Sequence, residues 1–175
     1  MRALTILAIC ASLPGRLAAQ SAVPADVLAD WERNRSTVLA YIDAVPDSAM
    51  GYRPTPGVRT LAEQFEHIVS TNLEVAAVAL KGQQAPPSLG VKADYLRSNS
   101  ALHRFAEATY DYVLEALRSA TPAQLQHPVA MYGQPPQPAA RLMTLSLEHA
   151  VWTLGQVVPY LRLNGVKPPE YKMPF

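Results

Sequence analysis

Proline and glycine clusters divide this chain of 175 residues into four stretches of helical length. Most of the 16 prolines lie in the connections between these stretches. Proline has no amide hydrogen and crowds the preceding turn, so it disfavours the interior of a helix. The sequence therefore predicts helices over about Asp26–Ala44, residues 60–81, residues 92–119 and residues 139–164.

Apolar residues recur at helical spacing in all four stretches, which gives each predicted helix one inward face. In the second stretch that face consists of Leu61, Phe65, Ile68, Asn72, Val75, Ala76 and Ala79. Thr60 and Glu63 have the spacing of a capping box at its start. No convincing strand and no internal repeat is present. The fold class is therefore all-α, as a four-helix bundle with long Pro-rich connections.

Several local features sharpen this prediction. Pro159 lies inside the fourth helix, where we expect a kink or a break in backbone pairing. Gly165 suits the left-handed cap at the end of that helix. Residues 131–138 are expected to be neither helix nor central strand. Either long link, 82–91 or 120–138, can be a crossover connection.

The first 19 residues have the order of a secretory signal peptide, with Arg2, an apolar core and small residues before Gln20. A lipoprotein signal around Cys10 is the second interpretation. Cleavage after Ala19 leaves residues 20–175 as one domain in an exported protein, periplasmic or secreted. It removes the single cysteine, and with Arg2 and Arg16 it changes the net charge from +1 to −1. We therefore expect neither nucleic acid nor, after cleavage, a membrane as a partner.

Histidine is the residue type in this chain that is best suited to bind a metal ion. His149 and Thr153 are four residues apart on one helix face, and His67 belongs to another helix. Two imidazoles and an oxygen donor are a plausible set for Zn or Ni. A shared zinc ion needs the two imidazole nitrogens within about 3–4 Å of each other. The alternative is that both histidines are hydrogen-bonded residues at the edge of the core.

The chain resembles the DinB-like proteins, the DinB/YfiT group of four-helix-bundle metalloenzymes, from about Val27 to Tyr171. The N-terminal matches are Trp31, Tyr52-Arg53-Pro54, Gly57-Val58-Arg59-Thr60-Leu61 and Glu66-His67. The C-terminal matches are Glu148-His149, Gly155-Gln156, Tyr160-Leu161-Arg162-Leu163-Asn164-Gly165 and Pro168-Pro169-Glu170-Tyr171. No single piece is decisive, but the pieces occur in the family's order.

The resemblance implies a divalent metal held by His67 and by an H-x-x-x-H pair whose members here are His149 and Thr153. Threonine in place of the third histidine is a departure that weakens the implied site. The implied function is a metal-dependent hydrolase or transferase for a small substrate, with catalytic residues unassigned and no organic cofactor. The alternative is a metal-free, non-catalytic bundle that serves as a binding or interaction module, with a homodimer as one assembly. Gln64 is expected to reach the site or face solvent, and Tyr132 to cover the pocket.

Overall fold

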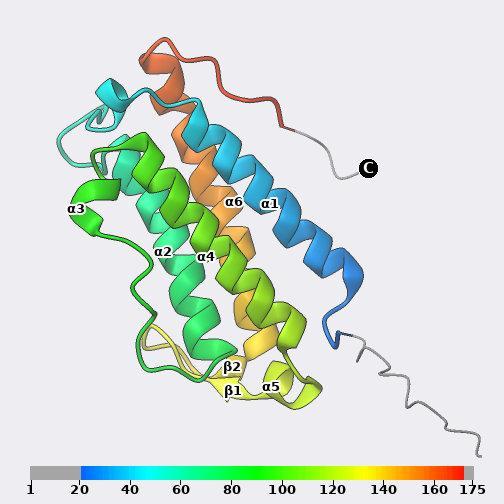
Figure 1. Cartoon of the computed structure of the whole chain (residues 1–175). Coiled ribbons are helices and arrows are strands. Elements are labelled where there is room, and N and C mark those ends of the chain that lie inside the picture. The colour runs from blue at the N-terminus through cyan, green and yellow to red at the C-terminus, as the bar shows by residue number, and fades with distance from the viewer. Residues whose placement is uncertain (1–20, 172–175) are drawn as a thin grey trace, which may run out of the picture.

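The computed structural model describes residues 21–171, and four long helices account for most of them (Figure 1). These are α1 (Ala25–Asp43), α2 (Leu61–Ala79), α4 (Asn99–Ser119) and α6 (Ala139–Leu163). The short elements are the 3-10 turn η1 (Asp47–Ala49), α3 (Lys92–Tyr95), α5 (Pro122–Gln126), β1 (Pro128–Val129) and β2 (Gln137–Pro138). The all-α prediction is confirmed, whereas the predicted signal peptide lies outside the described residues. None of the described helices is long and apolar enough to cross a membrane.

The helices are arranged so that α1 and α2 each pack against both α4 and α6. Figure 1 shows α2 and α4 running in the same direction, with α6 running in the opposite direction beside α2. The link after α2 therefore returns along the length of the bundle to α3, which makes residues 80–91 a crossover connection. This topology gives α2 and α6 a long antiparallel contact, and the candidate site lies on that contact.

Helix α2 begins where the sequence predicts, at a capping box. The Thr60 hydroxyl accepts a hydrogen bond from the Glu63 amide at 3.2 Å, and the Glu63 carboxylate accepts one from the Thr60 amide at 2.7 Å. These bonds satisfy amides that have no partner within the helix. All seven residues of the predicted inward face are buried. The start of α2 is therefore set by local chemistry, and its orientation by burial of one face.

The third predicted helix is wrong in one respect, because it is divided into α3 and α4 by residues 96–98. The Asn99 side-chain amide donates to the carbonyls of Ile42 and Val45, at the end of α1. Tyr95 stacks on Phe105, with the ring centroids 4.3 Å apart. These contacts fold the α3 turn back onto α4, which a single straight helix would not permit.

The link over residues 120–138 contains α5 and a minimal antiparallel ladder in which Pro128 pairs with Pro138. Residues 131–138 are thus neither helix nor central strand, as expected. Helix α6 continues through Pro159, and the predicted break in backbone pairing is confined to one hydrogen bond. The carbonyl that loses its partner there belongs to Gly155, which is exposed and has no side chain, so water can reach that carbonyl.

A chain of buried polar side chains connects all four long helices. The Ser146 hydroxyl of α6 donates to Asn72 of α2 at 2.7 Å, and the Asn72 amide donates to the Tyr110 hydroxyl of α4 at 3.3 Å. Tyr110 in turn donates to Asn34 of α1 at 2.6 Å. All four residues are less than a tenth exposed. We call this set the interhelix network, and it fixes how the helices are placed along one another.

Candidate metal centre

His67 of α2 and His149 of α6 face each other across the contact between these two helices. Their Nε2 atoms lie 3.1 Å apart, and the two rings are edge to face with centroids 4.8 Å apart. His67 occupies the second turn of α2, and the antiparallel α6 brings His149 opposite it. The separation satisfies the distance requirement for two nitrogens that share one zinc ion.

Thr153 follows His149 by one turn on α6 and is buried. Its Oγ1 atom lies 3.4 Å from His149 Nε2, on the side where the two imidazole nitrogens converge. The structure thus brings His67, His149 and Thr153 together, and their binding of a metal stays a prediction. The remaining histidines lie elsewhere, because His103 contacts Asp43 and His127 is exposed beside the short ladder.

Both imidazoles of the pair are held in the neutral form. Burial is the main cause that lowers the pKa of His67, and the positive charge of Arg59 and the neighbouring His149 lower it further. Burial, followed by Arg59, also lowers the pKa of His149. A neutral imidazole has a free lone pair and can act as a metal ligand at neutral pH. Desolvation and a nearby cation therefore favour the ligand form of both residues.

A second group of side chains closes the end of the site nearest the start of α2. The Tyr160 hydroxyl donates to the backbone carbonyl of Arg59 at 3.1 Å and accepts a hydrogen bond from Gln64 at 3.3 Å. Tyr52 packs edge to face on the Tyr160 ring. Gln64 is buried, so it does not face solvent, and its described hydrogen bond goes to Tyr160 and not to either histidine. Instead it braces Tyr160, which anchors the segment that carries Arg59.

A cavity of about 520 Å³ opens beside the histidine pair, between α2, α6 and residues 131–137. Its walls are mainly apolar, formed by Val75, Met131, Pro135, Leu142 and Leu145. His67 and His149 line it together with the polar residues Ser70, Thr71, Glu74, Tyr132, Gln134, Gln137 and Ser146. The expected position of Tyr132 at the pocket is confirmed. The space is large enough for a small organic molecule next to the imidazoles.

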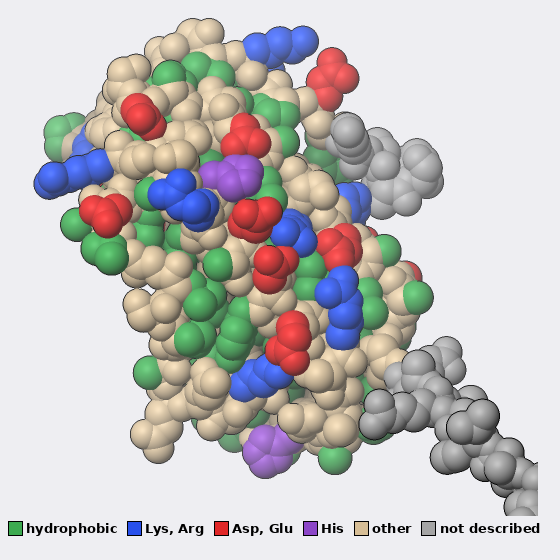
Figure 2. Space-filling view, viewed as in Figure 1, with side chains coloured by type: hydrophobic (Ala, Val, Ile, Leu, Met, Phe, Trp, Pro, Cys, Tyr) green, Lys and Arg blue, Asp and Glu red, His purple; other side chains and the backbone are tan. Residues whose placement is uncertain are grey.

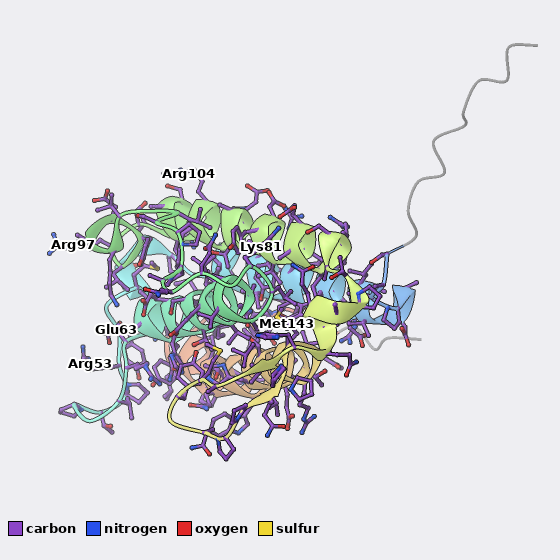
Figure 3. The ribbon with its side chains drawn as sticks, turned by 90° about the horizontal axis from the view of Figure 1, so that it is seen from below. Arg53, Glu63, Lys81, Arg97, Arg104 and Met143 are labelled. Atoms are coloured by element: carbon purple, nitrogen blue, oxygen red, sulfur yellow. The ribbon has the colours of Figure 1, made fainter. Side chains whose placement is uncertain are left out.

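Sequence reasoning missed two charged residues around this site. Glu74 lines the cavity two helical turns after His67, and Arg59 precedes the α2 cap. Glu74 could have been predicted, because its spacing of seven residues from His67 places both on the same face of α2. Arg59 carried no such signal, because its place depends on the contact with Tyr160. Figure 3 shows Arg53 and Glu63 at that same end of the bundle, where they form an ion pair at 3.6 Å.

His67, His149 and Thr153 together supply part of the ligand set that a divalent ion needs. Two imidazole nitrogens and a hydroxyl leave positions for water or substrate, as catalytic zinc sites do. Among residues 21–171 there is no group of three or more His, Cys, Asp and Glu side chains placed to share an ion. Thr153 is a weaker donor than histidine, and His149 Nδ1 is buried with no partner in the same part of the chain. Both features lower the affinity expected of the site.

Comparison with known proteins now assigns the family. The DinB superfamily sequence model matches residues 30–170, so the chain belongs to the DinB superfamily. A DinB-like protein from Bacillus subtilis, YjoA, has a similar crystal structure, with TM-score 0.69, 18% identity, and coverage of 86% of this chain and 99% of that one. A DinB-like protein from Bacillus cereus gives TM-score 0.68, 19% identity, and coverage of 83% and 95%. None of the curated proteins compared with the chain matches it.

Proposed function

We propose that this DinB-superfamily protein is exported and binds one divalent metal ion at His67, His149 and Thr153. We further propose that it uses the ion for hydrolysis or group transfer on a small substrate in the adjoining cavity. The observation that carries the proposal is the 3.1 Å separation of the two Nε2 atoms of His67 and His149, which line a cavity of about 520 Å³. The proposal of export rests on the order of residues 1–19.

A divalent ion in this place would lower the pKa of a bound water or thiol, which supplies a nucleophile at neutral pH. The protein's own residues provide the surroundings. His67 and His149 offer lone pairs, because burial and Arg59 disfavour their protonation. The apolar cavity walls exclude water from the body of a substrate and hold it against the imidazoles. Catalytic groups beyond the ligands are left unassigned.

A second candidate function is a metal-free bundle that binds a partner or small ligand without chemistry. The observation that favours it is the direct hydrogen-bonding distance between the two imidazoles. One neutral ring can donate from Nε2 while the other accepts, so the pair satisfies itself without an ion. Thr153 in the third position also fits a site that has lost its metal.

Metal analysis of tag-free protein after equilibrium dialysis against Zn²⁺ or Ni²⁺ tests the proposal. We expect one equivalent bound to the wild type, and an affinity loss of about hundredfold or more in His67→Ala, because one of two nitrogen ligands is removed. His127→Ala is the matched control, since His127 lies on an exposed link away from the site. Stoichiometric binding that is unchanged in His67→Ala would overturn the assignment of the ligands.

Thr153→His separates the two candidate functions. It places a third imidazole one turn from His149, which completes the family's triad. Tight binding in this variant alone, with none in the wild type, identifies a degenerate site and supports the non-catalytic function. One equivalent in the wild type excludes the metal-free function whatever the variant does.

A further inference from the structure

The cavity beside the histidine pair has one carboxylate in its wall. Of the described residues that line it, Glu74 is the only acidic one, and no lysine or arginine is among them. The remaining surface is mostly apolar. A carboxylate in such surroundings attracts a positive charge more strongly than it would in bulk water.

Glu74 is half-buried and has one described hydrogen-bond partner. The Tyr132 hydroxyl donates to Glu74 Oε2 at 3.0 Å, and Glu74 forms no ion pair with any of residues 21–171. Partial burial and the bond to Glu74 raise the pKa of Tyr132 above its usual range, so the hydroxyl stays protonated and donates. Oε1 of Glu74 therefore remains available as an acceptor.

The loop that carries Tyr132 is shaped to keep this contact. Tyr132 and Gly133 have φ values of 55° and 69°, and the Gln134 amide donates to the Met131 carbonyl at 2.9 Å. Two successive positive φ values are typical of a type I′ turn, which a tyrosine adopts at a cost. The turn holds Tyr132 against Glu74 and orients one carboxylate oxygen, so the second oxygen is held in place for a ligand.

We infer that the cavity selects small molecules with an apolar body and a positively charged amino group, which Glu74 recognises. The inference rests on the proposed function, because it names the substrate class of the same site. Glu74 lies seven residues after His67 on one face of α2, which separates the two side chains by ~10 Å along the helix. An ammonium group bound to Glu74 would thus place the other end of a chain of about six carbons near the imidazoles.

Three probes of equal length test the charge preference: hexylammonium, 1-hexanol and hexanoate. Each is titrated into metal-free protein in chelator, and binding is followed by NMR of the methyl groups of Leu142, Leu145 and Met131. We expect hexylammonium to bind about tenfold or more tightly than 1-hexanol, and hexanoate to bind least, because only the ammonium pairs with the carboxylate. Equal binding of hexanoate and hexylammonium would overturn the inference.

Three variants test whether the preference for hexylammonium depends on Glu74. Glu74→Gln is expected to weaken hexylammonium binding about tenfold or more and leave 1-hexanol unchanged, which also shows that the variant is folded. Glu115→Gln, on the outer face of α4, is the matched control and should bind like the wild type. Tyr132→Phe should keep the preference for the cation, because it frees the carboxylate. If Tyr132→Phe loses as much of the preference for hexylammonium over 1-hexanol as Glu74→Gln does, Glu74 serves only to hold the loop through Tyr132 and does not bind the cation.

These measurements are independent of metal binding. A wild type that prefers hexylammonium but binds no metal contradicts the proposed function and leaves this inference standing. A wild type that binds one metal ion but shows no preference among the three probes contradicts this inference alone.

Discussion

Two polar clusters include hydrogen bonds between α2 and α6, and they differ in how completely their polar atoms are paired. In the interhelix network, Ser146 donates to Asn72, Asn72 donates to Tyr110, and Tyr110 donates to Asn34, all deep in the core. At the histidine pair, the side chains are half-buried, border a cavity, and leave His149 Nδ1 without a partner in the described part of the chain.

This difference separates a structural cluster from a candidate functional one. A network in which each hydroxyl and amide is used stabilises one arrangement of helices, although its Ser146 also lines the cavity. A partly unsatisfied group beside a cavity is costly to stability and is available for binding. The two clusters are only one helical turn apart on α6, at Ser146 and His149, so matched variants can compare them directly.

The largest expected effect is on the network. Asn72→Leu removes both bonds made by the amide and leaves the Ser146 hydroxyl buried without its acceptor. We expect the free energy of unfolding to fall by about 3 kcal/mol, since each broken bond with a buried polar group costs about 1–3 kcal/mol. Urea denaturation followed by circular dichroism measures this loss. A change below about 1 kcal/mol would show that the network is not structural.

Tyr110→Phe should have the next largest effect. It removes one hydroxyl that donates to Asn34 and accepts from Asn72, while keeping the ring that packs against Trp31. The expected loss in the free energy of unfolding is about 2 kcal/mol. Tyr112→Phe is the control, because its hydroxyl bonds Gln83 at the surface and its removal should cost well under about 1 kcal/mol. Similar losses of stability in the two variants would show that the buried Tyr110 hydroxyl contributes no more than the surface hydroxyl of Tyr112.

The histidine pair is expected to respond more weakly. His149→Leu removes a buried nitrogen that lacks a partner, but it also removes the bond to His67, so the two effects offset each other. The free energy of unfolding of the metal-free variant should therefore change by less than about 1 kcal/mol. Ser146→Ala, one turn away, should instead lose about 1 kcal/mol, because Asn72 loses its donor. Denaturation of both proteins in chelator gives the comparison. If His149→Leu lowers the free energy of unfolding as much as Ser146→Ala does, the histidine pair stabilises the fold in the same way as the network.

The smallest expected effect comes from pH. Burial, helped by Arg59, lowers the pKa of His67 and His149 in the folded protein, so the unfolded chain binds more protons as acid is added. Stability contributed by the neutral histidines is present above about pH 6.5 and is lost as pH falls from there through the folded values.

A pH series of denaturation curves in chelator measures that loss. The window between about pH 6.5 and pH 4.5 isolates the histidines, since Glu63 and Glu115, with lowered pKa values, contribute only below it. Removal of both imidazoles in a His67→Leu, His149→Leu double variant should flatten the curve in this window. An unchanged slope there would assign the acid sensitivity to other groups.

Local patterns were sufficient for much of the fold. The capping box at Thr60 and Glu63, the inward face of α2 and the left-handed Gly165 all follow from interactions within a few residues. Local sequence patterns did not predict structure that depends on contacts between distant residues. The helix break at residues 96–98 is an example, because Asn99 donates hydrogen bonds to carbonyls at the end of α1. The two tryptophans also differ in the tertiary structure, where Trp31 is fully buried and Trp152 is 69% exposed.

The charged side chains on the face formed by α1 and α4 are mixed in sign. Figure 2 shows acidic and basic side chains interspersed over the face formed by α1 and α4, without a patch of one sign. Many of these charges are paired across helices, as Arg35 is with Asp111. Exposed pairs of this kind contribute little to stability, about 0–1 kcal/mol each.

The sequence by itself determined the helices, their inward faces and the three residues of the candidate site, because helical periodicity and family motifs are local properties of the chain. Only the tertiary structure decided that His67 meets His149, and that Ser146 belongs to a separate network. It also decided that Glu74 is the only Asp, Glu, Lys or Arg among the described residues that line their cavity. The physical reason is the antiparallel packing of α2 on α6. It pairs residues far apart in the chain, and no local pattern specifies which pairs meet.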